Sequence, residues 1–180
     1  MSTSSGADSV GSLDPIFDDV MRANSAYQDE FALGHMTDIA GITARGLAVV
    51  TCMDSRIEPL ALLGLKPGDA KILRNAGAHV TESVLRDLTL ASHLLKVDRV
   101  MVIAHTRCRM ASTTAEEVVD EIGHSSGIDV RSLEFGLIAD QAESLHHDVQ
   151  RIRSWPFLRT GVTVGGFLYD VTTGGLQQLC

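Results

Sequence analysis

The apolar residues of the chain form short continuous runs and longer stretches with helical spacing. Three runs are continuous: 46–52 (GLAVVTC), 70–74 (AKILR) and 99–104 (RVMVIA). The first and third are rich in β-branched residues and are typical of strands buried on both faces. The second ends in NAG, which is a turn signal. We therefore predict three neighbouring core strands from these runs.

Helical spacing of apolar residues precedes, separates and follows these runs. It occurs in four stretches: 13–31, 84–95, 118–122 and 138–152. Thr81 is predicted to cap the second helix, and Thr113 with Glu116 is predicted to form a capping box for the third. The fourth helix is predicted to stop before Pro156, because proline lacks the amide that a helix interior needs.

A further short helix and two C-terminal strands are predicted, and together the elements indicate the fold class. Pro59 can open a short helix that Gly64 closes, and residues 162–179 predict a strand, a turn and a short strand. Strands that alternate with helices predict an α/β fold with a central, mostly parallel β-sheet flanked by helices. In such sheets, sites form beyond the carboxyl ends of the strands, so the residues directly after each run are the candidates.

Domain organisation is predicted to be simple. Residues 1–12 are rich in serine and glycine, which predicts a disordered tail. No repeat or linker divides the remainder, so 13–180 is interpreted as one α/β domain.

Charge and cysteine content narrow the function. The 180 residues include 15 lysines and arginines against 23 acidic residues, a net charge of −8, which argues against a nucleic-acid or membrane-surface binder. No secretory signal and no membrane-spanning run is visible, so we expect a cytoplasmic protein. Three widely spaced cysteines form a poor disulfide framework, and in a reducing compartment they suggest metal ligands or catalytic groups.

Cysteine and histidine occur at the predicted strand ends. Cys52 closes the first strand, and His105 and Cys108 follow the third. Two thiolates and one imidazole suit Zn²⁺, and three protein ligands leave a fourth position open, as in catalytic zinc sites. Cys180 could fill that position only if the C-terminus folded back over the strand ends, which we do not expect.

Asp54 and Arg56 stand two and four residues beyond Cys52. Asp54 could bind zinc as an anionic fourth ligand, or it could pair with Arg56 and leave room for water. A zinc-bound water has a lowered pKa and is a nucleophile near neutral pH. Since two thiolates donate more charge than neutral imidazoles, hydration is expected to favour alkaline conditions.

Three motifs, in this order and spacing, resemble the β-class carbonic anhydrases. They are Cys52-Met53-Asp54-Ser55-Arg56, Arg74-Asn75-Ala76-Gly77 and His105-Thr106-Arg107-Cys108. The similarity is strongest to the short bacterial branch, which also includes carbonyl sulfide hydrolases. The resemblance implies one Zn²⁺ per chain on Cys52, His105 and Cys108, a working Asp54–Arg56 dyad, and a homodimer or higher homo-oligomer with sites near the subunit interface.

The implied reaction is the reversible hydration of CO₂ to bicarbonate and a proton through a zinc-bound hydroxide. In this mapping Arg56 keeps Asp54 off the metal, Asp54 accepts a hydrogen bond from the hydroxide, and Ala76 and Gly77 line a small apolar pocket. Three alternatives remain. The zinc site could hydrolyse carbonyl sulfide or carbon disulfide, the chain could be a catalytically impaired zinc-binding homologue, or Cys108 could be a metal-free nucleophile activated by His105.

Several further residues allow more than one role. Arg109 stands where the family usually has glycine, and it could crowd the site or attract bicarbonate. Arg74 could belong to the site or hold neighbouring loops together by ion pairs and hydrogen bonds. His79 is interpreted as a surface histidine, with a proton relay as the alternative. Thr106 and Arg107 are interpreted as spacers. Ala104 also stands where the branch often has histidine.

Overall fold

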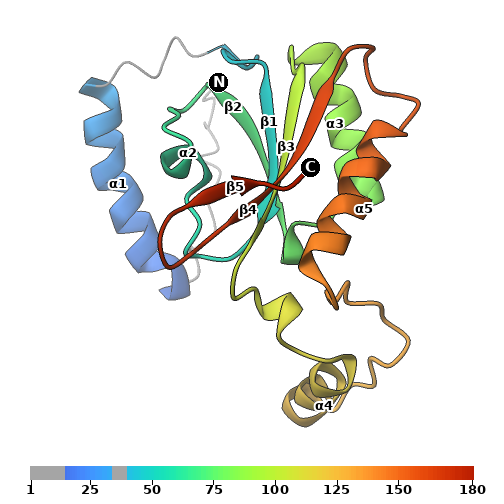
Figure 1. The fold of residues 1–180 in the computed structure, drawn as a ribbon. Helices are drawn as coiled ribbons and strands as arrows, with labels where there is room; N and C mark the ends of the chain where they lie inside the picture. Colours follow the sequence, from blue (N-terminus) through green and yellow to red (C-terminus); the bar gives the residue numbers. More distant parts are fainter. Residues whose placement is uncertain (1–14, 34–39) are drawn as a thin grey trace, which may run out of the picture. The chain divides into compact units, whose positions relative to one another are not determined.

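The computed structural model describes residues 15–33 and 40–180. The chain divides into two units, Met1–Ile39 and Ala40–Cys180, which we describe separately. The predicted tail, 1–12, lies outside the described residues. In the first unit a 3₁₀ turn, η1 (Pro15–Phe17), leads into helix α1 (Asp18–Leu33), so the described part of the first predicted helix is confirmed (Figure 1).

The second unit is built on one five-stranded sheet of order β2-β1-β3-β4-β5. Its strands are β1 (Leu47–Cys52), β2 (Ala70–Asn75), β3 (Arg99–His105), β4 (Thr163–Tyr169) and β5 (Leu176–Gln178). The first four are parallel, and β5 runs antiparallel to β4. The predicted α/β fold with a mostly parallel sheet is therefore confirmed, as are all the predicted strands.

The register of the parallel strands brings the candidate residues to one edge. Cys52 pairs with Asn75 across β1 and β2, and Thr51 pairs with Ile103 across β1 and β3. The strand ends that carry Cys52 and His105 therefore lie side by side, although Thr51 and Ile103 are 52 positions apart in the sequence. Parallel topology produces this convergence, because all carboxyl ends point the same way.

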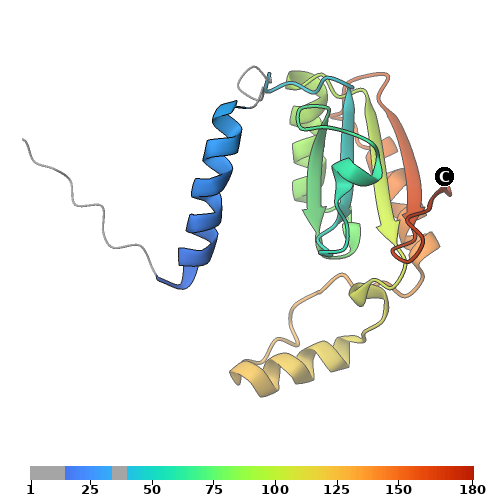
Figure 2. The same cartoon turned by 90° about the vertical axis from the view of Figure 1, so that its left-hand side faces the viewer.

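Long helices cover one face of this sheet, and a single short helix of the same unit lies on the other (Figures 1 and 2). The helical segments of the second unit are α2 (Pro59–Leu62), η2 (Ala76–Ala78), α3 (Glu82–Leu94), η3 (Arg109–Ala111), α4 (Ala115–Ser126) and α5 (Gln141–Arg153). Buried residues of α3 and α5, Leu88 and Val149 among them, form the main core with Val50 and Val102 of the sheet. Leu62 of α2 packs on the opposite face. Among the described residues, no helix has the length and hydrophobicity needed to cross a bilayer.

Of the two predicted helix caps, one agrees with the structure and the other is displaced by one residue. The hydroxyl of Thr81 accepts the amide of Val84, as predicted for α3. For α4 the capping box is formed by Thr114 and Glu117, so the predicted pair of Thr113 and Glu116 is wrong by one residue. Both pairs fit the S/T-x-x-E pattern, so the pattern alone does not distinguish them.

Helix α5 also begins later than its apolar spacing predicts. Asp140 caps it by accepting the amide of Glu143, and Gln141 is its first residue. Ile138, the first apolar residue of the predicted helix, precedes α5, and its amide donates to the carbonyl of Met110 at 2.8 Å. Ile138 therefore ties the segment before α5 to η3.

Candidate metal centre

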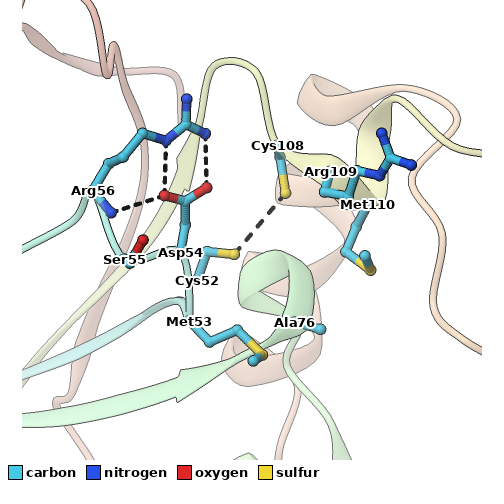
Figure 3. Close-up of a pocket in the computed structure, with 9 residues that line it drawn as sticks. All are labelled: Cys52, Met53, Asp54, Ser55, Arg56, Ala76, Cys108, Arg109 and Met110. Carbon is cyan, nitrogen blue, oxygen red and sulfur yellow. Dashed lines mark hydrogen bonds and ion pairs between the residues drawn. The ribbon is translucent and has the colours of Figure 1, made fainter.

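Cys52, His105 and Cys108 form one buried cluster at the carboxyl ends of β1 and β3. Each offers one potential ligand atom, and these atoms all lie within 4.8 Å of one another. The two sulfurs are 4.0 Å apart and face each other in Figure 3. All three side chains are almost completely buried. Cys180 lies away from this cluster, because its carbonyl accepts a hydrogen bond from the amide of Gly166 in the middle of β4. This position agrees with our expectation that Cys180 is not a fourth ligand.

The histidine of this cluster is oriented for a metal. His105 Nδ1 lies 2.9 Å from the carbonyl of Thr106, and because a carbonyl only accepts, Nδ1 carries the proton. The other nitrogen, Nε2, then presents a lone pair, and it is buried without a hydrogen-bond partner among the described residues. A buried polar atom without a partner needs an explanation, and a metal ion supplies one.

The protonation states also fit a metal better than a free nucleophile. Burial lowers the pKa of His105, which keeps the imidazole neutral and able to bind a cation. Burial is also the main cause that raises the pKa of the Cys108 thiol, and the adjacent Cys52 adds to it. A nucleophilic cysteine needs a lowered pKa, so the metal-free alternative is disfavoured. Two sulfurs and one imidazole nitrogen form a donor set that suits Zn²⁺.

Asp54 is held by Arg56 beside this cluster (Figure 3). Arg56 Nη2 is 2.7 Å from Asp54 Oδ2, and both Arg56 Nε and the Arg56 amide donate to Oδ1 at 2.9 Å. Arg56 Nη2 also donates to the carbonyl of Arg107 at 3.0 Å, which joins this loop to the loop that carries His105 and Cys108. The hydrogen bonds that Arg56 donates to Asp54 hold the pKa of the Asp54 carboxyl well below its usual range. Of the two predicted states, the structure has Asp54 paired with Arg56.

Asp54 nevertheless remains close to the ligand atoms. Its Oδ2 lies 4.0 Å from His105 Nε2, and its side chain is 17% exposed. The carboxylate can therefore interact with a small molecule held next to His105 while Arg56 still binds it. An ionised carboxylate can only accept hydrogen bonds. Asp54 can therefore accept a hydrogen bond from a molecule in the site but cannot donate one.

Arg74 holds the backbone of the same loop. Its Nε donates to the carbonyl of Cys52 at 3.0 Å, and its Nη2 donates to the carbonyl of Asp54 at 2.7 Å. The interpretation of Arg74 as a residue that joins loops therefore agrees with the structure, although its partners are carbonyls rather than carboxylates. Asn75 closes the next turn, since its side chain bonds both the amide and the carbonyl of His79.

The loop that carries His105 and Cys108 has supports that the sequence did not reveal. Thr106 was interpreted as a spacer, yet its hydroxyl donates to Asp170 and accepts the amide of Val171. Gln141, the first residue of α5, donates to the carbonyl of His105 at 2.7 Å. Asp170 and Gln141 lie 64 and 36 residues away from their partners, so no local signal in the sequence identifies them.

A cavity of about 420 Å³ opens onto the cluster. The residues that line it are Cys52, Met53, Asp54, Ser55, Arg56, Ala76, Cys108, Arg109 and Met110 (Figure 3). Ala76 belongs to this wall, whereas Gly77 is not among the lining residues and is buried in a left-handed turn, with φ of 83°. The guanidinium of Arg109 points away from the two sulfurs in Figure 3, so it does not occupy the space between them.

Comparison with known proteins agrees with this site. The family model described as carbonic anhydrase matches residues 47–176, a span that contains the complete cluster. A relative named beta-carbonic anhydrase 1, from Mycobacterium tuberculosis, is 31% identical over 151 residues, which cover 83% of this chain and 91% of the relative. The chain belongs to the β-carbonic anhydrase family.

Other members of the β-carbonic anhydrase family extend the comparison. The crystal structure of carbonic anhydrase from Streptococcus mutans superposes with a TM-score of 0.83 at 32% identity, covering 93% of this chain and 99% of that one. A carbon disulfide hydrolase from Acidithiobacillus thiooxidans is 29% identical over 153 residues, covering 74% of this chain and 76% of the relative. Family membership therefore leaves the choice of substrate open.

Proposed function

We propose that this chain catalyses the zinc-dependent, reversible hydration of CO₂ to bicarbonate and a proton. The observation that supports this best is the buried group of two sulfurs and one unpartnered imidazole nitrogen, with an arginine-held carboxylate 4.0 Å from that nitrogen. Cys52, His105 and Cys108 hold one Zn²⁺ per chain in this proposal, and 13–180 acts as one catalytic domain. Asp54 and Arg56 are the catalytic residues.

The residues of the site divide into metal ligands, an Asp54–Arg56 pair and an apolar wall in this proposal. When bound, Zn²⁺ supplies a Lewis acid that activates water for attack on carbon. Asp54 accepts a hydrogen bond from that water and orients it, because Arg56 keeps the carboxylate ionised. The apolar side chains of Met53, Ala76 and Met110 line the space for a small linear substrate. Ala76 contributes to this wall directly, and Gly77 permits the turn behind it.

A second candidate is hydrolysis of carbon disulfide or carbonyl sulfide at the same zinc site. It is favoured by the similarity to the carbon disulfide hydrolase of Acidithiobacillus thiooxidans and by the two methionines of the cavity wall. CO₂ hydration ranks first because the Mycobacterium tuberculosis relative is slightly more similar and covers more of both chains.

We also propose a homodimer or higher homo-oligomer in the cytoplasm. Apolar side chains recur along η1 and α1, for example Phe17 and Val20. An apolar helix surface of this kind is typical of interaction sites, and a second copy of the chain is the partner that the family resemblance suggests. The three cysteines are free, which agrees with a reducing compartment.

The substrate is tested by stopped-flow CO₂ hydration from about pH 6.5 to 9.5 on protein of measured zinc content. Carbonyl sulfide and carbon disulfide are assayed on the same preparation. We expect CO₂ hydration that increases toward alkaline pH. Sulfide release without CO₂ hydration would establish the second candidate, and stoichiometric zinc without turnover on any substrate would establish an impaired homologue.

The zinc site is tested by comparing two cysteine variants. Cys52→Ala is expected to reduce the metal content from about one zinc per chain to nearly none, because a buried thiolate ligand is removed. Cys180→Ala is the matched control and is expected to retain zinc, since Cys180 lies beside β4. Metal analysis after dialysis gives the answer, and full zinc retention by Cys52→Ala would contradict the proposed ligand set.

A further inference from the structure

The imidazole of His79 occupies a close-fitting site next to the cavity wall. Its side chain is 21% exposed, so His79, which we interpreted as a surface histidine, is only partly accessible to solvent. Gly77 and Gly136 pack against the ring: a Cβ built on Gly77 would lie 2.8 Å from Nε2, and one on Gly136 would lie 3.2 Å from Cδ2. Both glycines have positive φ, a conformation that other residues adopt rarely.

Both ring nitrogens of His79 face oxygen atoms. Nε2 lies 2.7 Å from the carbonyl of Gly136, which can only accept, so Nε2 carries a proton. Nδ1 lies 3.4 Å from Oδ2 of Asp148, a residue of α5 that is only 6% exposed. In a neutral ring the Nδ1 lone pair would face this carboxylate. In the imidazolium, both nitrogens are protonated and both face a suitable acceptor.

Among the described residues, one opposite charge faces the ring. Asp148 supplies it from α5, while the groups that face the ring from the other sides are neutral: the carbonyl of Gly136, and Gly77 of its own turn. Asn75 binds the backbone of His79 through its amide side chain. A buried carboxylate is costly without a cationic partner, so Asp148 and His79 depend on each other.

We infer that His79 and Asp148 form a protonation-dependent clasp that fixes the wall of the substrate cavity. His79 joins three segments: the turn that contains Ala76, the segment that contains Gly136, and helix α5. As long as the imidazolium is present, these three segments are held in one arrangement. His79 is thus a positioning residue, since it acts through the wall and does not line the cavity.

The three joined segments all lead to the proposed active site. Ala76 lines the cavity directly. The segment of Gly136 continues to Ile138, whose amide donates to the carbonyl of the wall residue Met110. Helix α5 begins at Gln141, which donates to the carbonyl of His105. Loss of the clasp would therefore loosen two walls of the cavity and one support of the metal-ligand loop.

The direction of the pH dependence follows from the ion pair. Asp148 raises the pKa of His79 above its ordinary value of 6.5, against a smaller opposing effect of burial. A group whose pKa is raised by folding stabilises the protein below its unfolded pKa, and this contribution is lost as the pH rises through the folded pKa. The clasp is therefore closed in mildly acid solution and opens at alkaline pH, in the range where CO₂ hydration is expected to be fastest.

The test compares His79→Gln and Asp148→Asn with His146→Gln in zinc-loaded protein. His146 is an exposed histidine of α5 and serves as the matched control. NMR titration of the His79 ring is expected to give a pKa above 6.5 in the wild type and a lower one in Asp148→Asn. The melting temperature of His79→Gln is expected to lie about 3 °C below that of the wild type at pH 6 and to approach it at pH 9.

Hydrogen–deuterium exchange connects the clasp to the cavity wall. After correction for intrinsic rates, peptides covering 75–80 and 127–140 are expected to exchange about 10-fold faster in His79→Gln than in the wild type at pH 6, with little difference at pH 9. The control should behave like the wild type at both pH values. An unshifted His79 pKa, or differences that do not depend on pH, would overturn the inference.

This inference rests on the proposed function only where it calls the cavity a substrate site. If wild-type protein shows the raised pKa and the pH-dependent exchange but no CO₂ hydration, the clasp stands and the proposed function fails. If the protein is active, the clasp further predicts that KM for CO₂ in His79→Gln departs from the wild type at pH 6 more than at pH 9, whereas His146→Gln does not depart.

Discussion

The chain contains the same aspartate–arginine pairing twice, once in the proposed active site and once on an exposed segment. In DSR (54–56), the arginine amide and Nε donate to Oδ1 at 2.9 Å and Nη2 donates to Oδ2 at 2.7 Å. In DVR (129–131), the corresponding three distances are 3.0, 3.0 and 2.7 Å. In both places the arginine lowers the pKa of the aspartate, to about 2 for Asp129.

The two pairs differ in what surrounds them. The side chains of Asp129 and Arg131 are 60% and 78% exposed, whereas that of Asp54 is 17% exposed. The carbonyl of Asp54 accepts a hydrogen bond from Arg74 Nη2, and Asp54 Oδ2 lies 4.0 Å from His105 Nε2. The Asp-x-Arg sequence therefore specifies a local hydrogen-bonded turn, and only residues from distant parts of the chain make one of the two turns a candidate for catalysis.

The largest difference between the two pairs is expected in CO₂ hydration when the aspartate of each pair is replaced by alanine. Asp54→Ala should retain zinc and lower kcat/KM for CO₂ hydration by about 100-fold or more, because the attacking water loses its acceptor. Asp129→Ala should change kcat/KM by less than about twofold, since its pair is solvated and apart from the cavity. Stopped-flow assays at equal zinc content measure both.

Equal rates for these two variants would show that the position beside His105 has no mechanistic meaning. Zinc loss from Asp54→Ala would show instead that Asp54 contributes to metal binding. Asp54→Asn distinguishes the acceptor role further, because an amide of similar shape keeps one accepting oxygen but loses the charge that Arg56 pairs with.

An intermediate effect is expected from removing the arginine that supports the active-site pair. Arg74→Ala deletes two bonds to the carbonyls of Cys52 and Asp54, so the loop that carries both residues becomes less ordered. Hydrogen bonds from a charged donor contribute about 1.5–3 kcal/mol each to the stability of the loop. We expect about 1.4 kcal/mol of this to be lost in the transition state, because Arg56 still holds Asp54, and CO₂ hydration then falls about 10-fold. Arg131→Ala is the control, and it should leave the rate unchanged.

A rate for Arg74→Ala equal to that of Arg131→Ala would mean that the loop keeps its position without these bonds. Zinc content should be measured alongside, because Cys52 is one of the two residues whose carbonyls Arg74 holds. A loss of zinc together with activity would place the role of Arg74 in metal binding rather than in positioning Asp54.

The ligand cluster could be predicted from sequence because its signals are local. Strand ends are marked by apolar runs that stop at Cys52 and His105, and parallel pairing brings such ends together. The spacing of His105 and Cys108 places both on one loop. The chemistry of these side chains then restricts the metal, and the resemblance of all three motifs to one family agrees with the comparisons.

Other features escaped prediction because they depend on contacts between distant segments. His79 was interpreted as a surface residue because nothing near it in sequence indicates Asp148, which lies 69 positions further along the chain. The pair of Thr113 and Glu116 fitted the capping pattern as well as the pair one residue later, and the structure has the later one. The supporting roles of Gln141 and Thr106 likewise appear only once the strands are assembled.

The smallest effect in the comparison concerns stability at the exposed pair. Asp129→Ala is expected to lower the melting temperature by less than about 3 °C, because solvent screens an ion pair between two exposed side chains. Folding lowers the pKa of Asp129 to about 2, so its contribution is present above the unfolded value and is lost only as the pH falls through about 2. The difference from the wild type should therefore be constant between pH 6 and 9 and should shrink in 1 M NaCl. Differential scanning calorimetry measures the melting-temperature difference at each pH and salt concentration. A difference that decays toward alkaline pH would contradict this prediction, because we expect that behaviour of His79 and not of Asp129.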